Sequence, residues 1–328
     1  MIGTPDADLS RSELREKTGC VAAVRDVSFH VDPGEVFVVM GLSGSGKSTL
    51  VRTLIRLIEP TAGRVEIDGR DVTAADKDGL LQLRRHTSSM VFQHFGLLAH
   101  RTVLDNVAFG LEVQGMPKAE RHARAAEMLK LVGLGDAATQ FPDELSGGMQ
   151  QRVGLARAFA VEPKVMLYDE PFSALDPLIR RDMQDEVIRL QHETGKTMVF
   201  ITHDLPEALR LGDRIAIMRD GHLVQIASAD ELMAEPANDF VASFIGADRG
   251  IKRLRVRTLH DVELGPPQPG LRAPSVELDT SLHLALSTML SESVNHLNVT
   301  DKDGTTIGTV GIESITQMVS EARESTSA

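Results

Sequence analysis

The sequence predicts an α/β protein: a mostly parallel β-sheet covered by helices, carrying an inserted helical subdomain and followed by a small α+β unit. Three short, continuous apolar runs, at residues 36–40, 165–168 and 198–201, are typical of strands buried on both faces. Helical patterns lie between these runs, and this alternation produces parallel sheets. Residues from about 71 to 160 are helical almost throughout, so we interpret that stretch as an insertion.

The first elements follow in order along the chain. Residues 24–31 alternate apolar and polar side chains, which predicts a strand that ends at the turn signal of residues 32–34. The buried strand at 36–40 leads into a glycine-rich stretch. Apolar spacing at 48–58 predicts a helix, and a short strand is expected at 64–68.

The remaining elements rest on the same two periodicities. Breaks near residues 96, 115–117 and 141–142 divide the helical insertion. The later elements are strands at 89–92, 165–168 and 198–201, one long helix at 177–194, and a hairpin of 214–218 with 223–226 around Asp220 and Gly221.

We expect four segments in the chain. Residues 1–248 form the α/β domain, with the helical insertion at about 94–160. Residues 249–272 are expected to be a linker, because residues 265–270 are rich in glycine and proline. Residues 273–320 form the small unit, and residues 321–328 form a flexible tail. The expected linker carries a basic cluster: Lys252, Arg253, Arg255 and Arg257.

Composition excludes several classes of protein. Of 328 residues, 42% are hydrophobic and 25% are charged, which is ordinary for a globular protein and unlike a disordered one. No apolar run approaches the roughly 18 residues of a membrane span, and the charged N-terminus is unlike a secretory signal. The single cysteine, Cys20, allows no internal disulfide and suits a reducing cytoplasm. A net charge of −12 without a long basic run argues against nucleic-acid binding.

A phosphate-binding motif lies between the strand at 36–40 and the helix that follows it. Residues 41–48 fit G-x-x-x-x-G-K-[ST], in which glycines let backbone N–H groups curl around phosphate oxygens. Lys47 would reach the β- and γ-phosphates of ATP and the Ser48 hydroxyl would bind Mg²⁺. The alternative is a glycine-rich turn with an incidental lysine. The motif predicts a P-loop NTPase core whose ATP-binding residues are Gly41, Leu42, Ser43, Gly44, Ser45, Gly46, Lys47, Ser48 and Thr49.

Two carboxylates end the buried strand at 165–168. A carboxylate at the tip of a strand beside a phosphate loop suits Mg²⁺ coordination, and we assign that role to Asp169. Glu170 is placed to polarise the attacking water. The alternative is a solvated acidic pair that merely ends the strand.

The segment at residues 145–151, Leu-Ser-Gly-Gly-Met-Gln-Gln, opens a predicted helix that runs to Ala160. Taken alone, a Ser-Gly-Gly start is a helix cap with glycines that permit close packing. Together with the phosphate loop it matches the signature of the ABC-transporter ATPase family, and residues from about 21 to 245 resemble that family. The family often stacks adenine on an aromatic residue before the loop, but Phe29 and Phe37 are expected in the core here, so adenine would pack on apolar side chains near Cys20 and Val21.

Three further positions match family motifs: Gln93 the Q-loop, residues 173–176 the D-loop, and His203 the switch histidine. A lone histidine at a strand end is ordinarily a core or surface residue, and the ordered set of motifs reverses that interpretation. The resemblance implies that Glu170, His203 and Gln93 are catalytic and that Mg²⁺ is held by Ser48, Gln93 and Asp169. It also implies that ATP held by the opposite subunit is contacted by Ser146, Gly147, Gly148 and Asp176.

Several segments narrow the resemblance. Residues 92–98, 100–107, 174–180 and 183–186 look like the glycine betaine/proline (quaternary-amine) importer ATPases, and so do residues 17–19. The resemblance implies an ATP-hydrolysing subunit that powers import of a compatible solute: glycine betaine, proline or choline. The alternatives are an importer ATPase for another small solute such as an amino acid, a soluble ABC ATPase of DNA repair or translation, and a kinase or GTPase.

The resemblance also implies partners. Two copies of the chain would bind two ATP molecules between them in a head-to-tail sandwich. The surface of residues 95–107 would accept a helix of a multi-span membrane permease, which places the chain at the cytoplasmic face of the cell membrane. An extracytoplasmic solute-binding protein or domain would take part indirectly, and no nucleic acid is involved.

The small C-terminal unit resembles a single CBS (cystathionine β-synthase-type) motif. The alternative is a small dimerisation module without a ligand. Adenosine-binding members place Thr or Ser and then Asp after the second strand, where this chain has Gly311 and Ser314, so we expect no tight AMP or ATP binding. The basic cluster would instead sense ionic strength by binding anionic lipid, or it is a solvated basic face.

Overall fold

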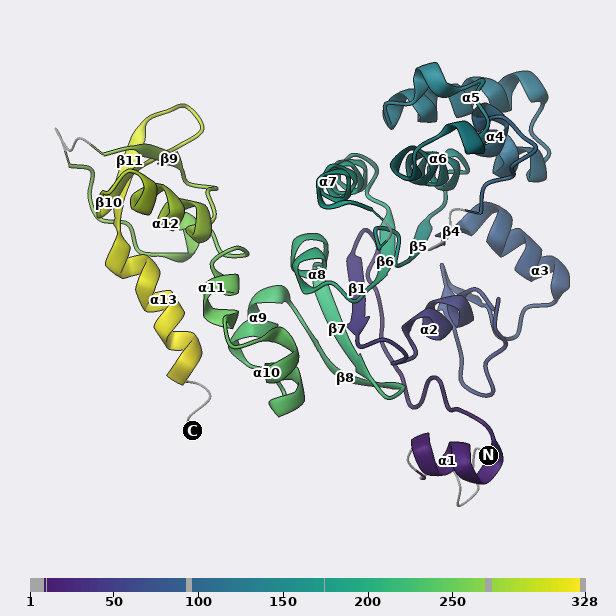
Figure 1. Cartoon of the computed structure of the whole chain (residues 1–328), viewed down its shortest axis with the longest axis horizontal. Coiled ribbons are helices and arrows are strands. Elements are labelled where there is room, and N and C mark those ends of the chain that lie inside the picture. The colour runs from purple at the N-terminus through teal and green to yellow at the C-terminus, as the bar shows by residue number, and fades with distance from the viewer. Residues whose placement is uncertain (1–8, 10, 93–95, 174, 269–272, 325–328) are drawn as a thin grey trace. The chain divides into compact units, whose positions relative to one another are not determined.

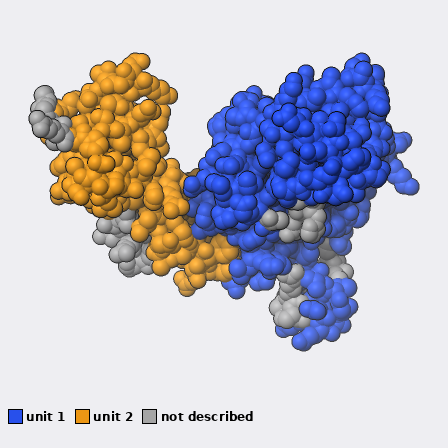
Figure 2. All heavy atoms as spheres, turned by 45° about the horizontal axis from the view of Figure 1, so that its top comes forward, with its two compact units in different colours: residues 1–223 blue, residues 224–328 orange. Residues whose placement is uncertain are grey.

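The computed structural model describes residues 9, 11–92, 96–173, 175–268 and 273–324 (Figure 1). The chain divides into two compact units, Met1–Leu223 and Val224–Ala328 (Figure 2). The division falls within a strand and lies before the boundary expected after residue 248. Each unit has its own buried apolar side chains.

A six-stranded sheet organises the first unit, in the order β4-β5-β6-β1-β7-β8. All pairs from β4 to β7 are parallel, and Val38 of β1 lies opposite Phe200 of β6. β7 and β8 form the predicted hairpin, with positive φ at Asp220 and Gly221. The predicted fold class is confirmed. The strands are β1 Val36–Gly41, β4 Ser88–Val91, β5 Val165–Asp169, β6 Thr197–Thr202, β7 Arg214–Arg219 and β8 His222–Ala227.

The apolar runs predicted as buried strands are the core of the sheet. All of β1 is buried, and so are the last four residues of β5 and the last five of β6. The chain's single tyrosine, Tyr168, is fully buried in β5, where its ring stacks on that of Phe200 with centroids 3.9 Å apart. Because parallel strands share one direction, the carboxyl ends of β1, β5 and β6 meet at one edge.

Helices pack against this sheet. α2 Lys47–Leu54 contacts β1, β5 and β6, and α8 Leu205–Leu211 contacts β1 and β6. The long helix α7 Pro177–Thr194 has the predicted bounds, with Asp176 as its N-cap and Gly195 at positive φ as its C-cap. The other short elements of the unit are α1 Arg11–Thr18, β2 Glu66–Ile67, β3 Arg70–Asp71, α3 Lys77–Gln82 and the π-helical turn η2 Leu83–Thr87.

The predicted helical insertion consists of three main helices that pack on one another, α4 Val103–Val113, α5 Lys118–Leu131 and α6 Gly147–Ala160 (Figure 1). Thr102 caps α4 by accepting a hydrogen bond from the backbone of Asp105, and the Asp105 carboxylate lies 2.9 Å from His122 Nε2 of α5. Two 3₁₀ turns, η3 Gly135–Ala137 and η4 Pro142–Glu144, connect α5 to α6.

Residues 24–31 differ from the prediction, because no strand is assigned there. Alternate burial is present: Val27 and Phe29 are half-buried, while Ser28 and His30 are exposed. Phe29 stacks on Phe37 of β1 with centroids 5.0 Å apart. The alternation of apolar and polar residues at 24–31 therefore arises because one side of this segment packs against the sheet, although the segment does not pair with any described strand through backbone hydrogen bonds. The predicted helix at 48–58 is also shorter, because it ends at Leu54.

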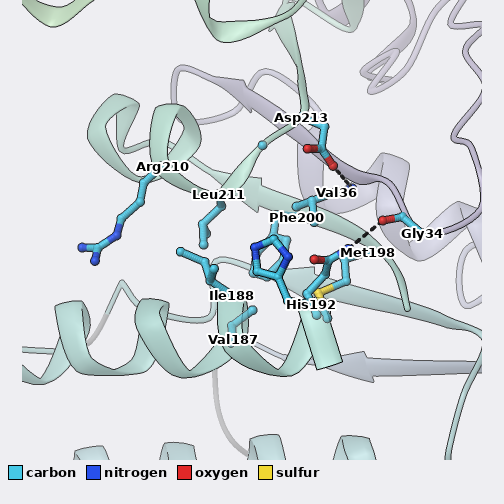
Figure 3. A pocket seen from close by; sticks show the side chains of 12 residues that line it. Gly34, Val36, Val187, Ile188, His192, Met198, Phe200, Arg210, Leu211 and Asp213 are labelled. Carbon is cyan, nitrogen blue, oxygen red and sulfur yellow. Dashed lines mark hydrogen bonds between the residues drawn. The ribbon is translucent and has the colours of Figure 1, made fainter. Parts of the chain in front are cut away.

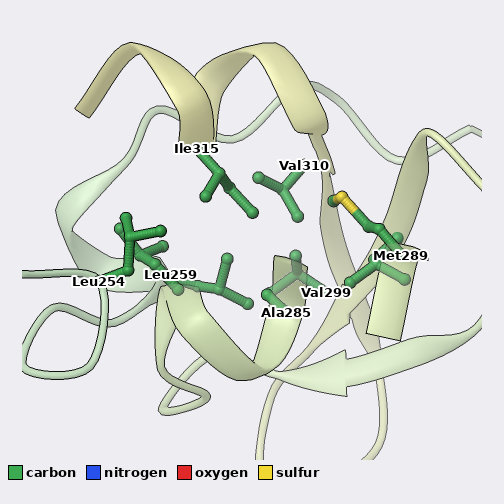
Figure 4. Close-up of a cluster of buried hydrophobic side chains, with 9 residues drawn as sticks. Leu254, Leu259, Ala285, Met289, Val299, Val310 and Ile315 are labelled. Carbon is green, nitrogen blue, oxygen red and sulfur yellow. The ribbon is translucent and has the colours of Figure 1, made fainter. Parts of the chain in front are cut away.

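The second unit contains the predicted strand–helix–strand–strand–helix order at its C-terminal end. β10 pairs in parallel with β9 and antiparallel with β11, and the buried side chains of both helices pack on the strands (Figure 4). The elements are β9 Ser275–Glu277, α12 Leu282–Ser291, β10 His296–Thr300, β11 Thr306–Gly311 and α13 Ile312–Glu324. α13 continues through residues 321–324, which were expected to be part of a flexible tail. The CBS-like assignment stays a prediction.

The expected linker is partly folded. It forms α11 Arg249–Arg253 and η5 Leu259–Asp261, and Leu254 and Leu259 belong to the core shown in Figure 4. The segment before it contains α9 Ala229–Ala234 and α10 Asp239–Ile245. Residues 249–261 are therefore structured, although the glycine- and proline-rich run after residue 264 predicted a linker.

The basic cluster also differs from the prediction. The Asp230 carboxylate of α9 receives hydrogen bonds from Arg253, at 2.6 and 3.0 Å, and from Arg257, both at 2.7 Å. Lys252 lies 2.7 Å from Asp248. Partial burial disfavours ionisation of Asp230, but the two guanidinium groups outweigh it and hold the pKa of this carboxyl well below its usual range. Three of the four expected lipid-binding charges are thus paired within the unit.

Candidate functional site

The phosphate loop lies where it was predicted, between the carboxyl end of β1 and the start of α2. Its tip, Leu42 to Gly44, is exposed, while Gly41 and Ser45 are buried. Gly46 has φ 109°, and a Cβ built there would collide with the carbonyl oxygen of Ala23. Only glycine fits this position, because the backbone is left-handed and the neighbouring backbone is too close for a side chain.

The polar groups of the loop fit a bound phosphate chain. The Lys47 ammonium lies inside the loop, where it donates to the carbonyl oxygens of Gly41, at 3.0 Å, and Leu42, at 3.1 Å. Burial lowers the pKa of Lys47, while the nearby carboxylates of Glu170 and Asp169 act against that shift. The Ser45 hydroxyl is buried and has no hydrogen-bond partner among the described residues. A phosphate oxygen would satisfy such a donor.

The two side chains predicted to hold Mg²⁺ touch each other. The Ser48 hydroxyl donates to Asp169 Oδ1 at 2.7 Å, and the Asp169 side chain is completely buried at the end of β5. Among the described residues no group of three or more His, Cys, Asp or Glu side chains could hold a metal ion. One hydroxyl and one carboxylate instead fit Mg²⁺, which takes only one or two carboxylates and shares the oxygens of a substrate phosphate.

Arg52 completes this arrangement, and sequence reasoning missed it. Its guanidinium donates to Asp169 Oδ2 twice, from Nε at 3.1 Å and from Nη2 at 2.8 Å. Arg52 lies four residues after Ser48 in α2, so both side chains leave the same face of the helix. That spacing is the signal in the sequence that could have identified it.

Glu170 and His203 are brought together because β5 and β6 are neighbours. Glu170 Oε2 lies 3.0 Å from His203 Nδ1, and the Glu170 backbone N–H donates to the Ile201 carbonyl at 3.0 Å. Glu170 has φ 49°, a conformation that non-glycine residues seldom adopt and that is concentrated at functional sites. A carboxylate beside an imidazole can accept a proton from water.

The signature residues begin a different helix, α6. The Ser146 hydroxyl caps this helix by accepting from the Met149 N–H at 3.3 Å, and Ser146 and Gly147 are exposed. A Cβ on Gly148 would lie 2.8 Å from Cγ2 of Ile179 in α7. The Asp176 carboxylate caps α7 with two hydrogen bonds of 3.1 Å to the N–H groups of Leu178 and Ile179. A helix start with exposed N–H groups can bind an anion that belongs to another molecule.

Gln93 lies outside the described residues, together with Phe95 and Ala174. Its assignments as a catalytic residue and as a metal ligand therefore stay predictions. Within the expected docking surface, Val103 and Val107 are fully buried in the helical subdomain, whereas Gly96, Ala99 and His100 are exposed. Val21, expected near adenine, is 45% exposed.

A pocket of about 330 Å³ lies elsewhere on the first unit (Figure 3). The pocket is lined by Val36, the first residue of β1, by Met198, the second residue of β6, and by Leu211 of α8, so it opens at the amino ends of the strands. The Asp213 carboxylate accepts a hydrogen bond from the Val36 N–H at 2.8 Å at its edge. The phosphate loop follows the opposite, carboxyl end of β1, so this pocket is not the nucleotide site.

In the described parts of the chain, no helix combines the length and the apolar character needed to cross a membrane.

Comparison with known proteins agrees with this geometry. Residues 24–173 match the ABC transporter family. The glycine betaine transport ATP-binding protein OpuAA of Bacillus subtilis is 48% identical over 92% of this chain and 70% of its own length. The trimethylamine N-oxide transport system ATP-binding protein TmoW of Ruegeria pomeroyi is 58% identical over 69% of this chain and 66% of its own length.

A solved ATP-binding cassette, described as a dimer in a post-hydrolysis state with ADP and phosphate, aligns with a TM-score of 0.59 and 38% identity. It covers 63% of this chain and 90% of that cassette. The chain belongs to the ABC transporter family, as an ATP-hydrolysing, ATP-binding subunit.

Proposed function

We propose that this chain hydrolyses Mg-ATP at the carboxyl edge of its sheet to power import of a compatible solute: glycine betaine, proline or choline. The observation that carries the catalytic part is the adjacency of two pairs, Ser48 with Asp169 and Glu170 with His203. The solute class is supported by relatives such as OpuAA, whose names specify glycine betaine transport.

Each residue has a defined task in this proposal. The loop N–H groups and Lys47 bind the phosphates, and Ser48 and Asp169 hold Mg²⁺, which would neutralise charge on the phosphate oxygens. Glu170 polarises the attacking water, and His203 holds the Glu170 carboxylate in position by the 3.0 Å contact. Gln93 is proposed to report the γ-phosphate and to share the metal.

Two copies of the chain are proposed to close on two ATP molecules. Support comes from the start of α6, where Ser146 and Gly147 are exposed. The first backbone N–H groups of a helix can bind a phosphate group of another molecule. The solved cassette that aligns with this chain is a dimer. Hydrolysis would remove the γ-phosphate that bridges the copies and so open the dimer.

Coupling of ATP hydrolysis to solute import requires a membrane partner. We place the chain peripherally at the cytoplasmic face of the cell membrane, bound to a multi-span permease by the surface of residues 95–107. An extracytoplasmic solute-binding protein or domain would deliver the solute. The proposed contact would use exposed positions such as Ala99 and His100, because Val103 and Val107 support the helical subdomain from inside.

Trimethylamine N-oxide is a second candidate solute. One relative named for its transport is 58% identical over 69% of this chain, compared with 48% over 92% for the glycine betaine relative, and a second one is 44% identical over 90% of this chain. Uptake of glycine betaine, choline, proline, trimethylamine N-oxide and a panel of amino acids, in cells that lack this chain, distinguishes the candidates. Uptake lost only for an amino acid other than proline would refute the proposed solute class.

Glu170→Gln tests the catalytic proposal. This variant should bind ATP, lose at least about 10²-fold in turnover because the acceptor for the proton of water is gone, and accumulate as an ATP-bound dimer. Phosphate release and light scattering at saturating Mg-ATP measure both effects. Glu120→Gln, which alters an exposed glutamate in α5, is the matched control and should behave as wild type. A monomeric Glu170→Gln chain would contradict the sandwich, and full turnover would contradict the role of Glu170.

A further inference from the structure

A buried carboxyl lies next to the Glu170–His203 pair. Glu207 is the third residue of α8, and only 4% of its surface is exposed. The spacing from Asp204 to Glu207 is that of a capping box, in which the glutamate would turn back to the N–H of the cap residue. Here that N–H, on Asp204, donates to the Thr202 hydroxyl at 3.0 Å. The Glu207 side chain is thus free to point inward.

The Glu207 carboxyl lacks part of its possible hydrogen bonding. The Thr202 hydroxyl hydrogen-bonds to it, but Glu207 Oε1 is buried without any hydrogen-bond partner in the part of the chain that the structure describes. A buried oxygen without a hydrogen-bond partner destabilises the fold, so its presence in a native protein calls for an explanation, such as a bound water or a catalytic role.

A small cavity joins this carboxyl to the candidate catalytic pair. It measures about 30 Å³ and is lined by Glu170, His203, Thr202, Arg180 and Glu207, among others. A site needs roughly 10–15 Å³ and two to four polar partners to hold one water molecule. This cavity meets both conditions, and two carboxyl groups, those of Glu170 and Glu207, are among its lining side chains.

Burial and nearby negative charge both favour the neutral form of Glu207. Burial raises the pKa of Glu207 to about 8, and the carboxylates of Asp204 and Glu170 add to this, while the Thr202 hydroxyl and the Arg180 guanidinium oppose it. Arg180 is largely engaged elsewhere, because it donates to the Leu175 carbonyl at 2.9 Å and lies 3.6 Å from Asp204. His203 is the other titratable group that lines the cavity.

We propose that Glu207 is a positioning residue for ATP hydrolysis: as a neutral acid it binds a water molecule in the cavity, and this water holds the Glu170 carboxylate against His203. An ionised Glu207 would place a second negative charge beside Glu170 in a site of low dielectric and would push the Glu170 carboxylate away. The inference rests on the proposed role of Glu170, and its test includes a readout that does not depend on turnover.

The pH dependence of kcat and KM, measured on the full-length chain, tests the inference. In the wild type, kcat should fall about tenfold per pH unit above pH 8, as expected for one essential protonated group, with KM little changed. Glu207→Gln keeps a neutral donor of the same shape, so its kcat at pH 7 should stay within about twofold and the decline near pH 8 should disappear. An unaltered decline in Glu207→Gln would overturn the inference.

Two further measurements separate positioning from a structural role. Glu207→Leu fills the site without a polar group, so kcat should fall at least about tenfold at unchanged KM. Equal kcat in the Leu and Gln variants would refute the bound water. The infrared carbonyl band of a protonated carboxyl should be present in the wild type at pH 7 and missing in Glu207→Gln. If this band is absent from the wild type, Glu207 is not a neutral acid and the inference is overturned. This readout does not depend on turnover, so it is decisive even if the Glu170→Gln experiment contradicts the catalytic role of Glu170.

Discussion

Removal of the Arg52 guanidinium should destabilise the nucleotide-free protein far more than an exposed ion pair would. Asp169 has no exposed surface, and its Oδ2 atom receives both hydrogen bonds from Arg52, at 2.8 and 3.1 Å. Among the described residues, the carboxylate in Arg52→Met keeps only the hydrogen bond from the Ser48 side chain. A buried charge without its partner is costly because neither water nor protein then solvates it.

The size of the effect follows from the exposure of the two partners. Removing one member of a fully buried pair costs about 3–5 kcal/mol. The Arg52 side chain is 42% exposed, so water screens part of the interaction, and we expect a loss of about 2–3 kcal/mol. For a unit of this size that loss lowers the melting temperature by about 4–12 °C.

Differential scanning calorimetry without nucleotide measures this shift. Arg64→Met is the matched control, because Arg64 pairs with Glu66 and Asp71 at the surface, where its side chain is 67% exposed, and such a pair contributes about 0–1 kcal/mol. With Mg-ATP the difference between Arg52→Met and wild type should narrow, because Asp169 then faces a bound cation. The reasoning is refuted if Arg52→Met melts no lower than Arg64→Met, or if Mg-ATP leaves the difference unchanged.

Two other predictions concern single charges. Lys47→Ala should weaken ATP affinity about 10- to 100-fold in isothermal titration, because a charge-assisted hydrogen bond contributes about 1.5–3 kcal/mol; unchanged affinity would mean that Lys47 does not contact phosphate. Asp230→Asn should lower the melting temperature of the second unit, since Arg253 and Arg257 lose their shared anion. Because the folded pKa of Asp230 is lowered, its contribution is complete above about pH 4 and is lost as the pH falls further. The calorimetric difference between Asp230→Asn and wild type should therefore be constant from pH 7 to pH 4 and shrink below it.

The sequence was sufficient for those parts of the site that depend on local chain order. A glycine-rich loop between a buried strand and a helix determines where Lys47 and Ser48 lie, and the parallel sheet brings Asp169 and Glu170 to the same edge. These contacts follow from strand direction, which hydrophobic patterns and spacing predict well.

Contacts between side chains of distant elements were not predictable in this way. Glu207 looks like an ordinary charged residue of an amphipathic helix, and only the packed structure shows that it points inward. The four-residue spacing from Ser48 places Arg52 on the same face of α2, but its contact with Asp169 of a different element is visible only in the fold. The same limit explains residues 24–31, whose alternation arises from one-sided burial without strand pairing. Leu254 and Leu259 were missed as core because the proline- and glycine-rich run beyond them dominated the local composition.

The buried position of Tyr168 gives the protein an internal optical reporter. The chain has one tyrosine and no tryptophan, and that tyrosine lies immediately before Asp169, stacked on Phe200 and without exposed surface. Burial raises the pKa of Tyr168 far above that of a free phenol. In solution above about pH 10, the pKa of a free phenol, tyrosinate absorbance therefore arises from molecules in which β5 has opened. A simple ultraviolet spectrum, without any label, counts the fraction of chains whose catalytic strand has come apart.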